Sequence, residues 1–560
     1  MPEFGVEVLS KEEASSALKP HRWPAERVAF LLVLVVTGAI LLGMILSILK
    51  LNNGTFIYSM DDPYIALALS DQISHGNYGI NASLHAAPAS SILFPFLLAA
   101  AAGSSFHPCL PLIINCLALF ATLAFLWRLF AHLGLAENTF GVVALGAGLL
   151  LLAICLNLIG VVFTGLEHSL HIAEVAACVY GIALFLDTRK MPPWLPAVIV
   201  LGPLLRYEGL ALSLGALVVL ALRGRWRTAA TAFAFIVLFL GGFSVFLVKL
   251  GLPLLPSSIL SKSDFAAKGM GGAGMGVLFS FGMNAWKMAH NPAGFAMLVI
   301  GVAAAVVCIR ELPAKPWRWT AQGLMALLLV CMIGGHAAAG QFGWLDRYED
   351  YALLGTAAIG ICLSRKAIRN ALSNKKRRLL YTCAAAAALA AICSRYIAST
   401  WLVPFYANNI YEQQFQMHRF VNDFYRAPVA VNDLGLVSYH NPNFVLDLGG
   451  LASEPARKLR FGDSDAEDYR AFVDGSKVHL VIIYDEWFED QIPGSWVKVA
   501  SMDLSRERVS SAEKEVQFYA TDVPRASILR PELQSFSRSL PPGVKLTIYS
   551  PDAETAHDRP

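Results

Sequence analysis

The chain has 560 residues, of which 56% are hydrophobic and 15% are charged, and its mean hydropathy is +0.53. Soluble domains carry about 25% charged residues, so this composition excludes an ordinary soluble protein and indicates repeated membrane crossing. The net charge of +3 is unevenly divided, since residues 1–403 hold 28 basic and 18 acidic side chains and residues 404–560 hold 16 and 23. The asymmetry predicts a basic membrane part and an acidic soluble domain, and no nucleic-acid partner is expected.

The amino-terminal part of the chain predicts one helix followed by a long polar loop. Residues 1–27 form a charged segment that we expect in the cytoplasm, and the apolar run Val28–Leu49 is long enough to span a bilayer. Because no small-residue cleavage site is evident, we expect a retained helix and not a cleaved signal peptide. Residues 50–108 then predict a long first outer loop, within which Ala89–Ala102 is apolar but scarcely long enough to cross.

The middle of the chain predicts a series of spanning helices. The run 194–222 is interrupted by Arg206-Tyr207-Glu208, so we expect two half-spans that turn back at Arg206. With both halves counted, the chain is predicted to cross about eleven times, as a mostly α polytopic membrane protein. The other apolar runs lie near residues 109–131, 139–160, 164–186, 228–250, 292–309, 319–338, 350–364 and 379–401.

Positive charge predicts which loops face the cytoplasm. Four short basic segments separate the predicted spans, and the last of them holds seven Lys/Arg and no acid. Basic loops stay inside, so the amino terminus is expected inside, and the first loop and residues 404–560 outside. The four segments are Asp187–Lys190, Arg223–Arg227, Arg310–Arg318 and Arg365–Arg378.

Residues 404–560 predict a compact soluble α/β domain. Pro428–Gly435 and Val445–Leu451 each indicate a short strand that ends in a polar turn, and Val478–Tyr484 indicates a buried strand. Arg457–Phe472 has the pattern of a helix. The chain therefore divides into residues 1–27, a membrane part over 28–403, and an extracytoplasmic domain over 404–560.

Ionisable groups at membrane depth are costly and tend to face a cavity or a partner. Asp61-Asp62 follows the first span; adjacent carboxylates can act as a general base or hold a divalent cation, although Asp62-Pro63 also suits a helix cap. Glu167 opens a span, where the helix dipole favours a carboxylate. His168, His171 and Glu174 share one helical face, but no strong ligand set completes a metal site there.

Three cations complete this set of polar groups. Arg206 and Glu208 interrupt an apolar run, where they either neutralise one another or face an outward cavity. Lys262 follows a stiff, Pro-rich loop and is a compact cation suited to phosphate. Arg347 can clamp a phosphate bidentately, although its aromatic neighbours also suit a membrane-interface belt. All of these groups are predicted on the outer side, which points to one shared pocket.

These motifs resemble, in order, those of the GT-C class of membrane glycosyltransferases, in particular bacterial arabinofuranosyl- and mannosyltransferase-like proteins. DDPYIALALSDQISHGNYGIN is similar to their first-loop DD-x-Y-I motif, TGLEHSL to SGLE, and LLRYEGL to L-x-R-P-E-x-L. LPSSILSK is similar to P-N-T-x-x-x-K, and GWLDRYEDY to their late R-Y/F motif. The chain departs from the pattern at Tyr207, at Ser257-Ser258 and at Ala89–Ile92, which bears on the sugar and the acceptor.

The resemblance implies an inverting glycosyltransferase of the bacterial cytoplasmic membrane. It would move a sugar from a polyprenyl-phosphate carrier to a cell-envelope glycan or lipid acceptor at the outer face, with no cofactor required and a divalent cation conceivable. Asp61 or Asp62 would be the base, and Arg206, Lys262 and Arg347 would hold the phosphate. Further expected substrate contacts or orienting residues are Tyr64, Glu167, His168, Glu208 and Tyr348.

Two other classes of protein would also place charges in an apolar chain. A transporter or lipid-carrier flippase should show an internal repeat and unwound helices near the bilayer midplane, and the sequence has no evident repeat. A non-catalytic scaffold or sensor, with the soluble domain as its ligand-binding module, leaves the buried cations and carboxylates unexplained. Glycosyl transfer is therefore the preferred prediction.

Overall fold

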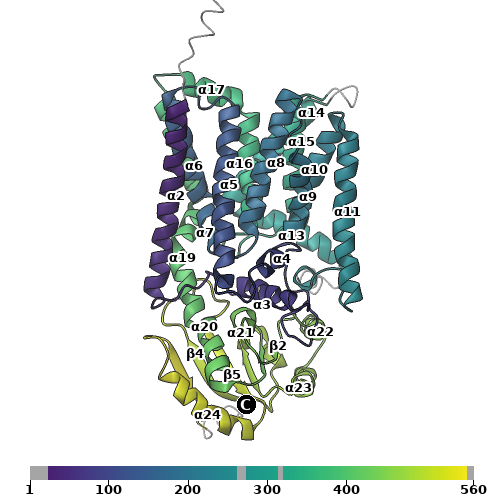
Figure 1. The fold of residues 1–560 in the computed structure, drawn as a ribbon, viewed down its shortest axis with the longest axis vertical. Coiled ribbons are helices and arrows are strands. Elements are labelled where there is room, and N and C mark those ends of the chain that lie inside the picture. Colours follow the sequence, from purple (N-terminus) through teal and green to yellow (C-terminus); the bar gives the residue numbers. More distant parts are fainter. Residues whose placement is uncertain (1–22, 262–272, 313–318, 551–560) are drawn as a thin grey trace, which may run out of the picture.

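The computed structural model describes residues 23–261, 273–312 and 319–550. These residues form a bundle of long helices, and a smaller α/β domain covers one end of the bundle (Figure 1). The helices of the bundle are α2 (Trp23–Leu51), α5 (Leu110–His132), α6 (Thr139–Cys155), α8 (His168–Thr188), α9 (Leu195–Leu205), α10 (Leu210–Leu222), α11 (Trp226–Lys249), α14 (Pro292–Arg310), α15 (Ala321–Ala339), α16 (Asp350–Leu363), α18 (Arg378–Ile392) and α19 (Ser394–Glu412).

Length and composition give the described chain six candidate membrane spans, or up to eight if each of two bent helix pairs is one span. The bent pairs are α16 with α17 (Arg365–Ser373), at 69°, and α18 with α19, at 67°. Large apolar side chains on α2, α11 and α14 stay exposed, as expected for helices that face lipid. The multi-pass membrane character is thus confirmed, whereas eleven crossings are not.

Helices α9 and α10 turn back on one another at Arg206, as the interrupted apolar run predicts. The Ser213 hydroxyl on α10 donates to the carbonyl of Ile199 on α9 over 2.7 Å. A Cβ added at Gly209 would lie 2.6 Å from the backbone of Gly202, so glycine is what allows the two half-helices to touch. The contacts show an antiparallel pair whose tip carries Arg206.

Two other segments differ in how well the sequence predicted them. The apolar stretch at 89–102 contains only the short helix α4 (Phe94–Ala99), in agreement with a segment that does not cross. Residues 273–290 form helix α13 (Ala273–His290), which the sequence did not predict.

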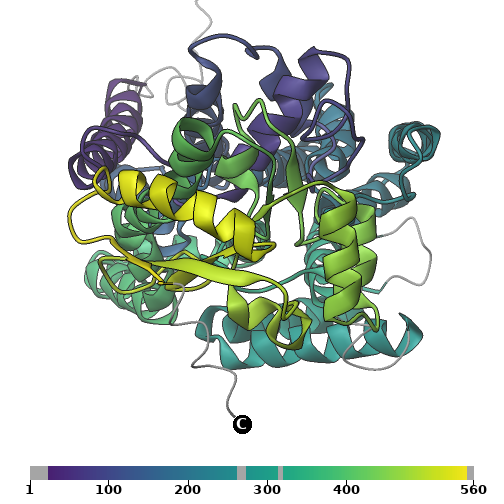
Figure 2. The same ribbon diagram turned by 90° about the horizontal axis from the view of Figure 1, so that it is seen from below.

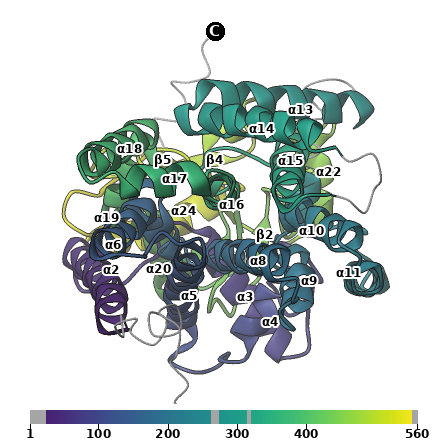
Figure 3. The same cartoon turned by 90° about the horizontal axis from the view of Figure 1, so that it is seen from above.

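The basic segments gather at the end of the bundle away from the α/β domain (Figures 1 and 3). Arg365 pairs with Asp187 at 2.9 Å, and Arg223 donates to the carbonyls of Trp319 and Leu186. These contacts join segments from four different loops. The common side that the sequence predicted for them is therefore confirmed geometrically within the described residues, which exclude 313–318; the compartment stays a prediction.

The carboxyl-terminal domain is built on one six-stranded sheet in the order β2-β1-β3-β5-β4-β6. Strands β1 (Val429–Val431), β2 (Val445–Asp447) and β3 (Leu480–Ile483) run parallel, and β4 (Val497–Asp503), β5 (Glu515–Ala520) and β6 (Lys545–Ile548) are antiparallel. The three strands predicted from the sequence are confirmed. Helices α20 (Gln414–Arg419), α21 (Gly435–Ser438), α22 (Glu454–Phe461), α23 (Ala466–Gly475) and α24 (Val523–Ser537) complete the domain.

The helix predicted over residues 457–472 is in fact two helices. Helix α22 ends at Phe461, before Gly462, and α23 begins with a capping box in which Asp465 and Asp468 satisfy each other's backbone N–H groups. This local chemistry terminates one helix and starts the next. Viewed from below, the domain lies across the end of the bundle (Figure 2).

The first loop and the α/β domain are joined by direct hydrogen bonds. The Asn81 side chain both accepts from the amide of Val445 and donates to its carbonyl, each at 2.9 Å. In the first loop, α3 (Asp62–Ser74) packs against α21, with the rings of Tyr64 and Tyr439 6.0 Å apart. The domain is therefore held in a fixed orientation over the end of the bundle.

Candidate functional site

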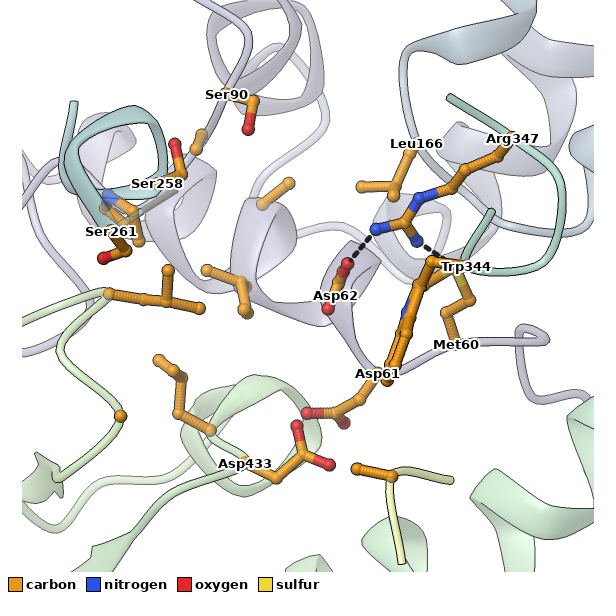
Figure 4. Close-up of a pocket in the computed structure, with 18 of the residues that line it drawn as sticks. Met60, Asp61, Asp62, Ser90, Leu166, Ser258, Ser261, Trp344, Arg347 and Asp433 are labelled. Atoms are coloured by element: carbon orange, nitrogen blue, oxygen red, sulfur yellow. Dashed lines mark hydrogen bonds and ion pairs between the residues drawn. The ribbon is translucent and has the colours of Figure 1, made fainter. Parts of the chain in front are cut away.

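A cavity of about 510 Å³ lies where the bundle, the first loop and the α/β domain meet. Its walls come from segments that are far apart in the sequence (Figure 4). Seven of the residues predicted from the sequence line it together: Asp61, Asp62, Glu167, His168, Arg206, Arg347 and Tyr348.

Adjacent in sequence, Asp61 and Asp62 have different surroundings. The Asp61 carboxylate is buried and accepts the amides of Gly435 (2.6 Å) and Leu436 (2.8 Å) from the α/β domain. The Asp62 side chain is 39% exposed and pairs with Arg347 at 2.7 Å. Asp62 therefore presents the accessible carboxylate, whereas Asp61 anchors the first loop to the domain.

Burial controls the ionisation of Asp61. Desolvation raises the pKa of Asp61 well above its usual 3.8, and the neighbouring Asp433 carboxyl raises it further. Desolvation likewise raises the pKa of Asp433, whose carboxylate accepts hydrogen bonds from Gln414 (2.8 Å) and Tyr484 (3.1 Å). Asp61 is buried and Asp433 is half-buried, and two hydrogen-bonded carboxyls in such a place share a proton, because both cannot be charged without a cation between them.

Arg347 reaches the cavity from an unusual turn before α16. Trp344, Leu345 and Asp346 all have left-handed backbone conformations, with φ of 49°, 62° and 53°. Such residues are strained and persist only where their surroundings hold them. Here Asp346 binds Arg395 (2.7 Å) and Ser399 (2.6 Å). The turn places the exposed Trp344 indole and the buried Arg347 guanidinium on the same cavity wall.

The Arg347 guanidinium is only partly satisfied. It contacts Asp62, the sulfur of Met60 and the Tyr348 hydroxyl, with its Cζ 4.9 Å from the Tyr348 ring. Its Nε has no hydrogen-bond partner among the described residues. A guanidinium in this state can accept a further anionic ligand.

Arg206 is held by two carboxylates. It pairs with Glu167 at 2.6 Å and with Glu208 at 2.9 Å, and it is almost fully buried. The sequence left open whether Arg206 and Glu208 neutralise one another or face a cavity. Arg206 pairs with Glu208 and also lines the cavity, whereas Glu208 does not line it. With its charge already compensated, Arg206 is better suited to positioning Tyr348, 5.8 Å away, than to holding a phosphate.

The remaining predicted residues have varied positions. Tyr64 does not line the cavity; it is buried, and its hydroxyl accepts the amide of Tyr58. Lys262 lies outside the described residues, although Ser258 and Ser261 of the same loop line the cavity. His171 and Glu174 are buried outside the lining. Among the described residues, no group of three or more His, Cys, Asp or Glu is placed to hold a metal ion.

The sequence missed several lining residues. Lys287 comes from α13, a helix that the sequence did not predict. Asn432, Asp433, Arg460 and Trp487 come from the α/β domain. The sequence did contain a signal for Asn432 and Asp433. Both directly follow a predicted strand, and ligand-binding sites of parallel sheets are found at the carboxyl ends of strands.

Residues 408–519 match a family model described as Domain of unknown function (DUF8728). The match covers part of the α/β domain and α19, and does not include the membrane part. No match to the chain was found among curated proteins.

Proposed function

We propose that the protein is an inverting glycosyltransferase that takes a sugar from a polyprenyl-phosphate carrier and passes it to a cell-envelope acceptor. The observation that supports this best is the pairing of Asp62 with Arg347 in a cavity at the end of an apolar helix bundle. A carboxylate can accept a proton from a hydroxyl, and a guanidinium can hold a phosphate. Their position beside the bundle suits a substrate whose lipid tail stays in the bilayer.

The side of the membrane follows from charge. The basic segments lie at the end of the bundle away from the α/β domain, which lines the cavity, and basic loops face the cytoplasm. We therefore place the cavity and the α/β domain on the outer side of the bacterial cytoplasmic membrane. A lipid-linked phosphate exposed at that interface would reach the cavity without leaving the bilayer.

The proposed reaction is a single displacement at the anomeric carbon. The acceptor oxygen attacks this carbon as the bond to the phosphate oxygen breaks, and polyprenyl phosphate leaves with the electron pair. The acceptor proton passes to Asp62. Arg347 and Lys287 stabilise the charge that develops on the leaving phosphate, and attack from the opposite face inverts the anomeric centre.

The Asp62–Arg347 ion pair suggests how donor binding prepares the base. In the present structure the carboxylate that must accept a proton is bonded to the guanidinium that must hold the phosphate. A donor phosphate competes with Asp62 for Arg347. When the phosphate takes Arg347, Asp62 is released to bond with the acceptor hydroxyl, so the base becomes available only when the donor is bound.

The decisive test is loss of a defined envelope sugar. We expect deletion of the protein to remove one sugar linkage from envelope glycans, measured by mass spectrometry, and the wild-type chain to restore it. Asp62→Asn should lower transfer by about 10²–10⁴-fold, the usual contribution of a general base. Asp71→Asn, on the same helix but outside the cavity lining, is the matched control. Unchanged glycans on deletion would overturn the proposal and favour a transporter.

A further inference from the structure

The carboxyl ends of the parallel strands in the α/β domain open into the same cavity. Asn432 and Asp433 follow β1, Gly449 follows β2, and Trp487 follows β3, and all four residues line the cavity. Ligands of open α/β sheets bind outside this edge of the strands. The domain thus contributes its own ligand-binding edge to the site in the membrane part.

The connections after β1 and β2 leave toward opposite faces of the sheet. On one face, Val429 and Val431 pack with Leu436 and Val437 of α21. On the other, Ala430 and Leu446 pack with Tyr469 and Val473 of α23. Neighbouring strands whose connections diverge in this way leave a crevice between their carboxyl ends. Asn432 and Gly449 stand at this crevice.

The glycine turn after β2 is not a phosphate cradle. Its backbone N–H groups at Gly449 and Ala452 already donate to the buried Asp447 carboxylate, over 2.7 and 2.5 Å. Gly450 adopts a left-handed conformation (φ +84°), which closes the turn around that carboxylate. The N–H groups of Gly449 and Ala452 are therefore already engaged and are not offered to a ligand such as a nucleotide phosphate.

Side chains at the crevice instead offer hydrogen bonds beside an aromatic ring. The Arg460 guanidinium lies 4.6 Å from the Trp487 ring and donates to the carbonyl of Gly449. The Asn432 Oδ1 accepts the amide of Tyr484, so its buried Nδ2 is a donor, and this atom has no hydrogen-bond partner among the described residues. Planar amide and guanidinium donors next to an indole suit a ring that carries several hydroxyl groups.

We propose that this crevice is the acceptor subsite and that it binds a sugar ring of a glycan acceptor. Arg460 and Asn432 would donate to its hydroxyls, and Trp487 would contact its apolar face. The inference rests on the proposed glycosyl transfer and specifies its acceptor class. The adjoining wall carries Asp62, so a sugar held here presents a hydroxyl to the base.

The test uses the full-length protein in lipid nanodiscs, with two separate measurements. The first is binding of oligosaccharides released by mild acid from the envelope of the deletion strain. The second is transfer to the same oligosaccharides from polyprenyl-phosphate sugars extracted from cells labelled with [14C]glucose. Arg460→Gln and Trp487→Leu are the variants, and Arg460→Lys is the conservative substitution. Lys458→Gln is the control, since Lys458 lies on the same helix with its side chain 72% exposed.

We expect Arg460→Gln and Trp487→Leu each to weaken oligosaccharide binding and to raise the acceptor KM by about tenfold, with the donor KM unchanged. Loss of one or two hydrogen bonds to Arg460, or of the aromatic contact with Trp487, produces a change of this size. Arg460→Lys should recover part of the affinity, and Lys458→Gln should behave as wild type. Unfolding midpoints show which variants are folded. If one variant fails to fold, the other carries the comparison.

The two proposals fail in different ways. If wild type binds the oligosaccharides through Arg460 but transfers no labelled sugar, the glycosyl transfer is wrong and the glycan subsite stands. If wild type transfers sugar while both variants keep the acceptor KM, the subsite is wrong and the transfer stands. Absence of both binding and transfer in wild type overturns both.

Discussion

Asp61 and Asp62 are neighbours in the chain, and the sequence offered no way to choose between them as the base. The structure separates them, because Asp61 is buried under two amides of the α/β domain and Asp62 faces the cavity. A buried carboxylate with both oxygens engaged is poorly placed to receive a proton from a substrate. We therefore assign the base to Asp62 in the proposed reaction, and an anchoring role to Asp61.

Competition for Arg347 predicts that Asp62→Asn, which lowers transfer by removing the base, tightens phosphate binding. An amide is a weaker partner for the guanidinium than a carboxylate, so the phosphate displaces it more easily. We expect about two- to fivefold higher affinity, since partly exposed ion pairs are worth about 0.5–1 kcal/mol. Calorimetry on nanodiscs with undecaprenyl phosphate, inorganic phosphate and undecaprenol would measure this. Unchanged or weaker phosphate binding by Asp62→Asn would contradict a competition between Asp62 and the donor phosphate for Arg347.

The shared proton of Asp61 and Asp433 predicts a pH dependence of stability. Both pKa values are raised by burial, so the folded pair keeps a proton that the unfolded chain releases above its ordinary pKa of 3.8. The contribution is fully present at acidic pH and is lost as the pH rises through the raised pKa. Thermal unfolding should therefore become easier as the pH rises above 3.8 and through the raised pKa, and Asp433→Asn should flatten this slope. An equal slope in the variant would argue against a shared proton.

At the scale of elements, the close contact of α9 and α10 determines where Arg206 lies. A Cβ at Gly209 would lie 2.6 Å from the backbone of Gly202, whereas one at Gly241 on α11 meets nothing within 4 Å. Both glycines are in helical segments, so the two substitutions differ in steric room. This makes them a matched pair.

We expect Gly209→Ala to destabilise the fold by about 1–3 kcal/mol, the usual cost of overpacking, and to lower transfer by displacing Arg206 and its two carboxylate partners. Gly241→Ala should be neutral or slightly stabilising, because alanine is the better helix former. Unfolding midpoints and transfer rates in nanodiscs would measure both effects. Similar behaviour of the two variants would show that the half-helices can separate without consequence.

At the scale of the whole molecule, the proposed function requires the α/β domain and the basic segments to face opposite sides of the membrane. Lys458 on α22 and Lys375 in the turn after α17 are exposed at the two ends. We expect a membrane-impermeant maleimide to label Lys458→Cys in intact cells and to label Lys375→Cys only after lysis, in a background with the native cysteines replaced by alanine. The reverse result would move the cavity to the cytoplasmic side and overturn an outer-face reaction.

The sequence by itself determined the membrane character and the turn at Arg206, whereas the predicted boundary at residue 404 falls inside helix α19 (Ser394–Glu412). These follow from local properties, since twenty apolar residues span a bilayer and a charged triplet interrupts a helix wherever it occurs. The common side of the basic segments also followed, because charge acts on each loop separately. The predicted helix over residues 457–472 was wrong for a local reason too, because Gly462 and the Asp465 capping box divide it into α22 and α23.

Only the tertiary structure decided which groups face one another. Arg347 meets Asp62 across 285 positions, Arg206 meets Glu167, and the α/β domain buries Asp61 and contributes Asn432, Asp433, Arg460 and Trp487 to the cavity. Motif spacing predicts none of these pairings, because contacts between distant segments depend on how whole helices and a sheet pack. The accessibility of each carboxylate, and hence its suitability as a base, is a property of that packing.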